Sequence, residues 1–186
     1  MKRVLLINGS PRQNGRTMGA LKLMEQIFLD NGIEVQWFQV GNKPIRGCIG
    51  CEGCEKKQRC VFTDDQCNAL IEAMLASDAI VVGTPVYFAG PSGALCALMD
   101  RAFYAAGSID HGQMLLKGKL AAAVAACWRA GATCAQDRLN RYFTPTGMTV
   151  VGSSYWNGYQ GEQDTYGAEA LKYLAKNMSQ LLLEQK

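Results

Sequence analysis

The stretch VLLINGSPRQNGRT, residues 4–17, decides the fold. Its first four residues form an apolar run as long as a buried strand, and the run stops at Gly9. Polar and turn-forming residues follow as far as Arg16, and a helical pattern begins at Thr17. The free N–H groups in the first turn of a helix, together with its dipole, attract an anion. The stretch therefore predicts a strand, a phosphate-binding loop and a helix, in that order.

The side chains of this loop suit a phosphate group. Hydroxyl and amide donors come from Ser10, Asn14 and Thr17, and charge-assisted donors come from Arg12 and Arg16. An ordinary connection between a strand and a helix is the alternative. Such connections usually span about 2–6 residues, whereas this one is longer and carries two arginines. We therefore favour ligand binding.

Spacing excludes two other phosphate-binding loops. A P-loop has four residues between its glycines, followed by Lys and then Ser or Thr. Here five residues separate Gly9 from Gly15, and Arg16 follows. The dinucleotide fingerprint G-x-G-x-x-G fails because Pro11 stands at its second glycine. The loop of the flavodoxin type, which holds FMN, remains.

The composition indicates one soluble globular domain over residues 1–186, with 48% hydrophobic and 19% charged residues. A net charge of +3 is too small to favour nucleic acid as a partner. No stretch approaches the ~20 apolar residues of a membrane span. A signal peptide is disfavoured because Asn8 interrupts the first apolar run. We expect a cytoplasmic protein without a membrane segment.

Strands and helices alternate along the chain. The apolar patterns predict strands at residues 4–7, 34–40, 79–83, 119–126 and 149–152, and helices at 17–31, directly after 64–65, at 94–106, at 134–143 and from 167 onward. This alternation predicts an α/β fold, a doubly wound sandwich with a parallel sheet and helices on both faces. Five strands with a phosphate loop after the first fit the flavodoxin-like order 2-1-3-4-5. Three segments are expected to be irregular: a Cys-rich insertion at about 41–63, a surface connection at 107–118 and an aromatic loop at 153–166.

The first and third strands of this order diverge, and a ligand binds above that switch point. Residues 9–17 and 84–93 should therefore line one crevice, and the loop after the fourth strand should close it. Aromatic side chains and flexible turns suit a flat ring system. The candidate flavin contacts are Pro85, Val86, Tyr87, Phe88, Gly90, Trp128, Arg129 and Gly131.

Four of the eight cysteines, Cys48, Cys51, Cys54 and Cys60, lie within thirteen residues. In a reducing compartment such thiols are metal ligands or redox groups rather than structural disulfides. Two-residue spacers let one tight loop offer three thiolates to a compact centre, which suits a [4Fe–4S] cluster. A zinc site with four thiolates and a loop of empty thiols remain open. Because His111 is the only histidine, zinc sites with several histidines are excluded, as are histidine-dependent hydrolases unless His111 is the base.

The motifs together resemble a known family. They are Gly9-Ser10-Pro11-Arg12, Cys48-x2-Cys51-x2-Cys54-x5-Cys60, Asp64-Asp65, Pro85-Val86-Tyr87 with Asp100-Arg101, Arg129-x-Gly131 and Asp164-Thr165-x-Gly167. The chain resembles the flavodoxin-like NAD(P)H-dependent FMN reductases, and within them it is most similar to the iron–sulfur flavoproteins. One departure is Cys127-Trp128, which stands where small residues are usual.

The resemblance implies how FMN would bind. Ser10, Arg12, Asn14 and Thr17 would hold the phosphate, residues 85–90 would carry the isoalloxazine, and residues 129–131 would approach its far side. It also implies a homodimer or homotetramer with the flavin near a subunit interface. The aromatic segment 155–159 is a candidate for that interface, with a plain surface turn as the alternative.

Three functions follow. In the first, FMN accepts a hydride from NADH or NADPH and passes electrons to a quinone, nitro or azo compound. This reaction needs no catalytic residue from the protein because flavin N5 carries the chemistry. In the second, FMN and a [4Fe–4S] cluster relay electrons between ferredoxin-like partners. In the third, weaker reading, the protein is a flavin-sensing module without turnover.

Overall fold

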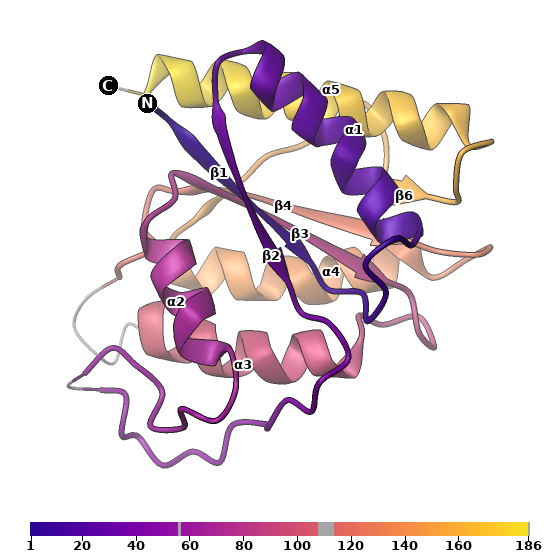
Figure 1. Cartoon of the computed structure of the whole chain (residues 1–186). Helices are drawn as coiled ribbons and strands as arrows, with labels where there is room; N and C mark the ends of the chain where they lie inside the picture. Colours follow the sequence, from indigo (N-terminus) through magenta and orange to yellow (C-terminus); the bar gives the residue numbers. More distant parts are fainter. Residues whose placement is uncertain (56, 108–113, 186) are drawn as a thin grey trace.

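The computed structural model describes residues 1–55, 57–107 and 114–185. A twisted sheet lies between two layers of helices (Figure 1). The strands are β1 (Arg3–Asn8), β2 (Glu34–Gln39), β3 (Ala79–Pro85), β4 (Leu120–Ala126), β5 (Thr149–Val150) and β6 (Gly158–Tyr159). The helices are α1 (Arg16–Asp30), α2 (Cys67–Leu75), α3 (Gly93–Gly107), α4 (Ala132–Phe143) and α5 (Thr165–Glu184), and a 3-10 turn follows α4 at Thr144–Thr146.

The predicted strand order is confirmed. The sheet runs β2-β1-β3-β4-β5, and each neighbouring pair is parallel. A sixth strand, β6, pairs with the end of β4 at Ala125 and Ala126. It lies in the segment that the sequence predicts as a loop. Two residues are too short to show a hydrophobic period, so this strand is visible only through its partner.

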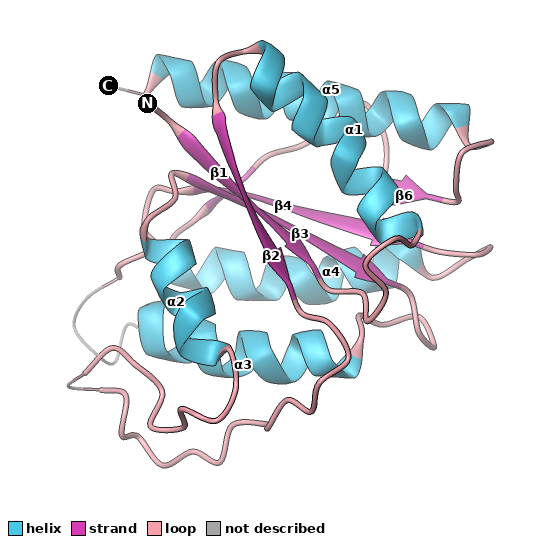
Figure 2. Ribbon diagram, viewed as in Figure 1, coloured by secondary structure: helices cyan, strands magenta, loops and turns pink. Residues whose placement is uncertain are grey.

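The helices divide between the two faces of the sheet (Figure 2). Helices α1 and α5 pack on one face, against Val4 and Leu6 of β1. Helices α2, α3 and α4 pack on the other, against Leu5 and Ile7 of the same strand. Successive side chains of a strand point to opposite faces, and a parallel sheet covered on both sides is apolar throughout. This explains the continuous apolar runs in β1, β3 and β4.

Several boundaries differ from the predicted ones. Helix α4 begins at Ala132, two residues before the predicted start, and α2 begins only at Cys67. Asp65 accepts a hydrogen bond from the N–H of Cys67 at 3.0 Å but is also paired with Arg101, and the position directly before the helix is Gln66. Half of the predicted connection at 107–118, with His111, lies outside the described residues. None of the helices in the described ranges is long and apolar enough to cross a membrane.

Gly9 is where β1 leaves the sheet for the predicted phosphate loop. Its N–H donates to the carbonyl oxygen of Gly83 at 2.7 Å. A Cβ atom at Gly9 would lie 2.7 Å from that same oxygen and 2.5 Å from Cδ2 of Leu95. Both distances are shorter than real contacts, so the position requires glycine.

Gly9→Ala is expected to lower the free energy of unfolding by about 1–3 kcal/mol, the usual cost of overpacking. The control is Gly93→Ala at the first residue of α3, where a Cβ has no atom within 4 Å. That substitution should leave stability unchanged or raise it by up to about 1 kcal/mol. Urea unfolding of both variants checks the prediction, and equal midpoints would contradict the close approach.

Candidate functional site

Three loops meet at the carboxyl edge of the sheet. The hydroxyl of Ser92 donates to the carbonyl oxygen of Gly9 at 2.7 Å, which joins the loop after β3 to the loop after β1. The N–H of Val86 donates to the carbonyl oxygen of Ala126 at 2.9 Å, which joins the β3 loop to the end of β4. A Cβ at Gly131 would lie 2.9 Å from Cα of Ala89. The segments that the sequence predicts as one crevice are therefore in direct contact.

The predicted phosphate loop, residues 9–16, is shaped by two amides that sequence analysis missed. Asn8 accepts a hydrogen bond from the N–H of Ser10 at 3.1 Å and donates to the carbonyl oxygen of Arg12 at 3.3 Å. Gln39, at the end of β2, bonds to the Asn8 side chain at 2.7 Å and donates to the carbonyl oxygen of Ser10 at 2.7 Å. These bonds fix the loop before any ligand arrives. The hydrogen bonds between Gln39 and the Asn8–Ser10 segment depend on the pairing of β1 with β2, which no local sequence pattern shows.

The side chains of the loop fall into two groups. Ser10 and Thr17 are buried, and the Ser10 oxygen accepts the N–H of Arg12 at 3.1 Å. Arg12 and Asn14 are exposed. Helix α1 has Gly15 at its N-cap and no side-chain cap. Uncapped N–H groups at a helix start are the donors that an anionic group requires.

The loop after β3 ends in a tight turn. Tyr87 and Gly90 exchange two backbone hydrogen bonds, of 2.9 and 3.0 Å, around Phe88 and Ala89. These two residues have φ values of +50° and +62°. Positive φ at both central positions is the geometry that normally selects Asn and Gly. The turn leaves the ring of Phe88 completely exposed and that of Tyr87 half exposed.

The loop after β4 borders a hollow that continues toward β6. Trp128 is 81% exposed, and Gly131 has a φ of +86° that places the loop against Ala89. The hollow measures about 270 Å³ and lies between residues 127–133 and the segment around β6. A second hollow of about 730 Å³ lies beside Arg12 and Asn14.

Tyr159 and Gln160 border both hollows. The N–H of Cys127 donates to the carbonyl oxygen of Tyr159 at 3.0 Å, so β6 is attached to the β4 loop. Sequence analysis names residues 155–159 as a candidate subunit interface, with a plain surface turn as the alternative, and does not associate residue 160 with the site. The pairing of β6 with β4 is a non-local contact that leaves no local pattern.

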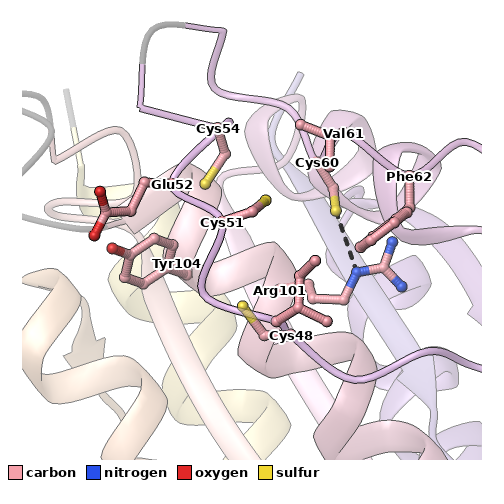
Figure 3. Close-up of a pocket in the computed structure, with 10 residues that line it drawn as sticks. Cys48, Cys51, Glu52, Cys54, Cys60, Val61, Phe62, Arg101 and Tyr104 are labelled. Atoms are coloured by element: carbon pink, nitrogen blue, oxygen red, sulfur yellow. Dashed lines mark hydrogen bonds between the residues drawn. The ribbon is translucent and has the colours of Figure 1, made fainter.

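The four predicted metal-ligating cysteines line one cavity beside α3 (Figure 3). Burial raises the pKa of the Cys54 thiol, and the charges of the other three cysteines raise it further. The donor set, four thiols facing one small cavity, has the chemistry of an iron–sulfur or zinc site. No three potential ligands among the described residues already have metal-binding geometry.

Cys60 is the most firmly held of the four. Its N–H donates to Oδ1 of Asn68 at 2.8 Å, and Nδ2 of Asn68 donates to its carbonyl oxygen at 3.1 Å. Its sulfur accepts a hydrogen bond from Nε of Arg101 at 3.2 Å (Figure 3). The Arg101 guanidinium also pairs with Asp65. Burial alone would raise the pKa of the Asp65 carboxyl, but the hydrogen bonds from Arg101 and from the N–H of Cys67, together with the charge of Arg101, outweigh it, and the pKa is lowered.

Comparison with known proteins identifies the class. An iron–sulfur flavoprotein of Methanocaldococcus jannaschii is 28% identical over 192 residues, which cover 97% of this chain and 97% of that protein. The structure of RosB with a bound riboflavin-5′-phosphate derivative has a TM-score of 0.74 at 17% identity, over 98% of this chain and 79% of that one. The apo form of an NADH:FMN oxidoreductase has a TM-score of 0.71 at 19% identity, and the match covers 100% of this chain and 92% of that one.

The fold and the relatives together define a flavodoxin-like flavoprotein. A family model described as NADPH-dependent FMN reductase matches residues 2–163. The chain belongs to the NADPH-dependent FMN reductase family, and it is an NAD(P)H-dependent flavin oxidoreductase. The predicted resemblance to the iron–sulfur flavoproteins is confirmed by the similarity over nearly the full length.

Ala89→Gly is expected to stabilise the flavin-free protein. A left-handed conformation costs an L-residue about 1–2 kcal/mol, and the greater freedom of unfolded glycine takes back about 0.5–1 kcal/mol. The net gain should be about 0.5–1 kcal/mol in urea unfolding. The control is Ala130→Gly, at an exposed position whose φ is negative. The control should lose about 0.4–1 kcal/mol; a loss in both variants would contradict the strained turn.

Proposed function

We propose that FMN binds at the carboxyl edge of the sheet with its phosphate in the loop after β1. The phosphate contacts are Ser10, Arg12, Asn14 and Thr17, and the ring contacts are Pro85, Val86, Tyr87, Phe88, Gly90, Trp128, Arg129 and Gly131. The observation that carries the proposal is the hydrogen bond between Ser92 and Gly9, which brings the loops after β1 and β3 together. The uncapped start of α1 supports the position of the phosphate.

We further propose that electrons pass from NADH or NADPH through FMN to a small acceptor such as a quinone, nitro or azo compound. Bound FMN supplies the hydride and electron chemistry. The protein positions the ring, and no side chain is assigned as an acid or base. The exposed rings of Phe88 and Trp128 leave open surface beside the proposed flavin for a second planar molecule. Donor and acceptor would use this surface in turn.

An electron carrier between ferredoxin-like partners is the second candidate. It is favoured by the cavity lined with Cys48, Cys51, Cys54 and Cys60 and by the relatives that are named iron–sulfur flavoproteins. In this reading the cysteines hold a [4Fe–4S] cluster, which supplies one-electron chemistry. A cytoplasmic location, an assembly as homodimer or homotetramer, and a single domain with a Cys-rich insertion at about 41–63 also remain proposals.

Anaerobically purified protein is expected to be yellow, to release FMN rather than FAD, and to contain about four irons per chain. Absorbance together with flavin, iron and zinc analysis checks these expectations in one preparation. Iron-free or zinc-containing protein with bound FMN would remove the cluster and leave the reductase. Colourless protein that does not take up added FMN would contradict the flavin site.

Arg12→Ala is expected to weaken FMN binding. The variant loses a charge-assisted hydrogen bond worth about 1.5–3 kcal/mol, so the dissociation constant should rise at least about tenfold. Fluorescence titration of the flavin-free protein measures it. The control is Arg141→Ala, an exposed arginine at the end of α4. Equal affinities of the Arg12 variant and the wild type would mean that the phosphate lies elsewhere.

A further inference from the structure

Arg101 lies in α3 beneath the cysteine cavity, with a side chain that is only 1% exposed. All three of its nitrogen atoms are used. Nη1 and Nη2 face the carboxylate of Asp65, and Nη1 also donates to the carbonyl oxygen of Arg46 at 3.0 Å. Nε donates to the sulfur of Cys60 at 3.2 Å. The salt bridge to Asp65 uses only Nη1 and Nη2, so it does not account for the hydrogen bond from Nε to Cys60.

The sulfur of Cys60 cannot easily move away from this donor. Asn68, at the first turn of α2, binds both the N–H and the carbonyl oxygen of Cys60, and it donates to the carbonyl oxygen of Phe62 at 3.1 Å. Cys48 and Cys51, by contrast, are exposed on the irregular segment. Helix α2, through Asn68, and helix α3, through Arg101, therefore hold Cys60 in place.

We propose that Arg101 is a positioning residue that raises the reduction potential of a [4Fe–4S] cluster bound through Cys60. The inference rests on the cluster of the proposed function. Reduction adds one electron, so the reduced state carries one more negative charge than the oxidised state. An N–H donor and a positive charge beside a ligand sulfur stabilise that extra charge. Asp65 orients the guanidinium and partly opposes its effect.

A purely structural role for the Arg101–Asp65 pair makes a different prediction. Asp65→Asn would then disturb the site in the same way as the loss of Arg101. In the proposed arrangement the two charges act in opposite directions on the added electron. Asp65→Asn removes a negative charge and should raise the reduction potential above that of the wild type. The double variant Asp65→Asn with Arg101→Gln also removes the Nε–H donor of Arg101, and its potential should lie below that of the wild type.

The experiment is an anaerobic redox titration of the holoprotein with dithionite as the electron source. The reduced cluster is followed by electron paramagnetic resonance, which separates it from the flavin. Relative to the wild type, the double variant should show a cluster equilibrium shifted at least tenfold against reduction. For a one-electron couple, this corresponds to a reduction potential that is lower by at least about 59 mV. Arg101→Lys keeps a positive charge opposite Asp65 and should lower the potential less. It carries the test if the double variant does not retain a cluster. Arg141→Gln is the surface control.

Two results would overturn the inference, and they are distinguishable. Wild-type protein that contains FMN but no iron would remove the proposed cluster and the role of Arg101 with it. A cluster that is present in all variants with one unchanged potential would leave the proposed function intact and assign Arg101 to structure alone. A rise in Asp65→Asn together with a fall in the double variant supports the inference.

Discussion

The hydrogen bonds at Gly9 are the constraint on which the rest of the architecture depends. The N–H of Gly9 donates to Gly83 and its carbonyl oxygen accepts the hydroxyl of Ser92, so one residue joins the ends of β1 and β3 through both of its backbone polar groups. At the switch point of a doubly wound sheet the connections of neighbouring strands leave toward opposite faces. A direct bond between the two exits holds the loop after β1 and the loop after β3 at a fixed separation, which a ligand touching both would require.

The sheet is predicted well because its strands and helices are encoded by hydrophobic patterns within short stretches of sequence. The apolar runs of β1, β3 and β4 and the helical periods between them predict a parallel sheet covered on both faces. The loop after the first strand then selects the strand order. The two-residue β6 and the amide of Gln39 carry no local pattern. Both act through residues distant in the chain: β6 through its pairing with Ala125, and Gln39 through Asn8 and Ser10. Such contacts are specified only when the fold is complete.

The candidate sites divide in the same way. Residue types and spacing predict which side chains belong to the phosphate loop and to the cysteine cavity. They do not show that Phe88 and Ala89 form a turn with positive φ, because nothing in that pair of residues favours such a turn. A local choice that conflicts with the observed backbone is typical of a functional site. The turn directs the ring of Phe88 into solvent, beside the position proposed for the flavin.

Helix α3 connects the two candidate sites physically. It begins at Gly93, directly after the Ser92 that binds Gly9, and it carries Arg101 eight residues later. At a rise of about 1.5 Å per residue, these positions are separated by roughly 12 Å along the helix axis. The packing of α3 against the sheet through Leu95, Leu98 and Ala102 makes that separation rigid. Helix α3 therefore begins beside the loop proposed to carry the flavin and contacts the sulfur of Cys60 two turns further on, so that one helix sets the separation of the two proposed sites.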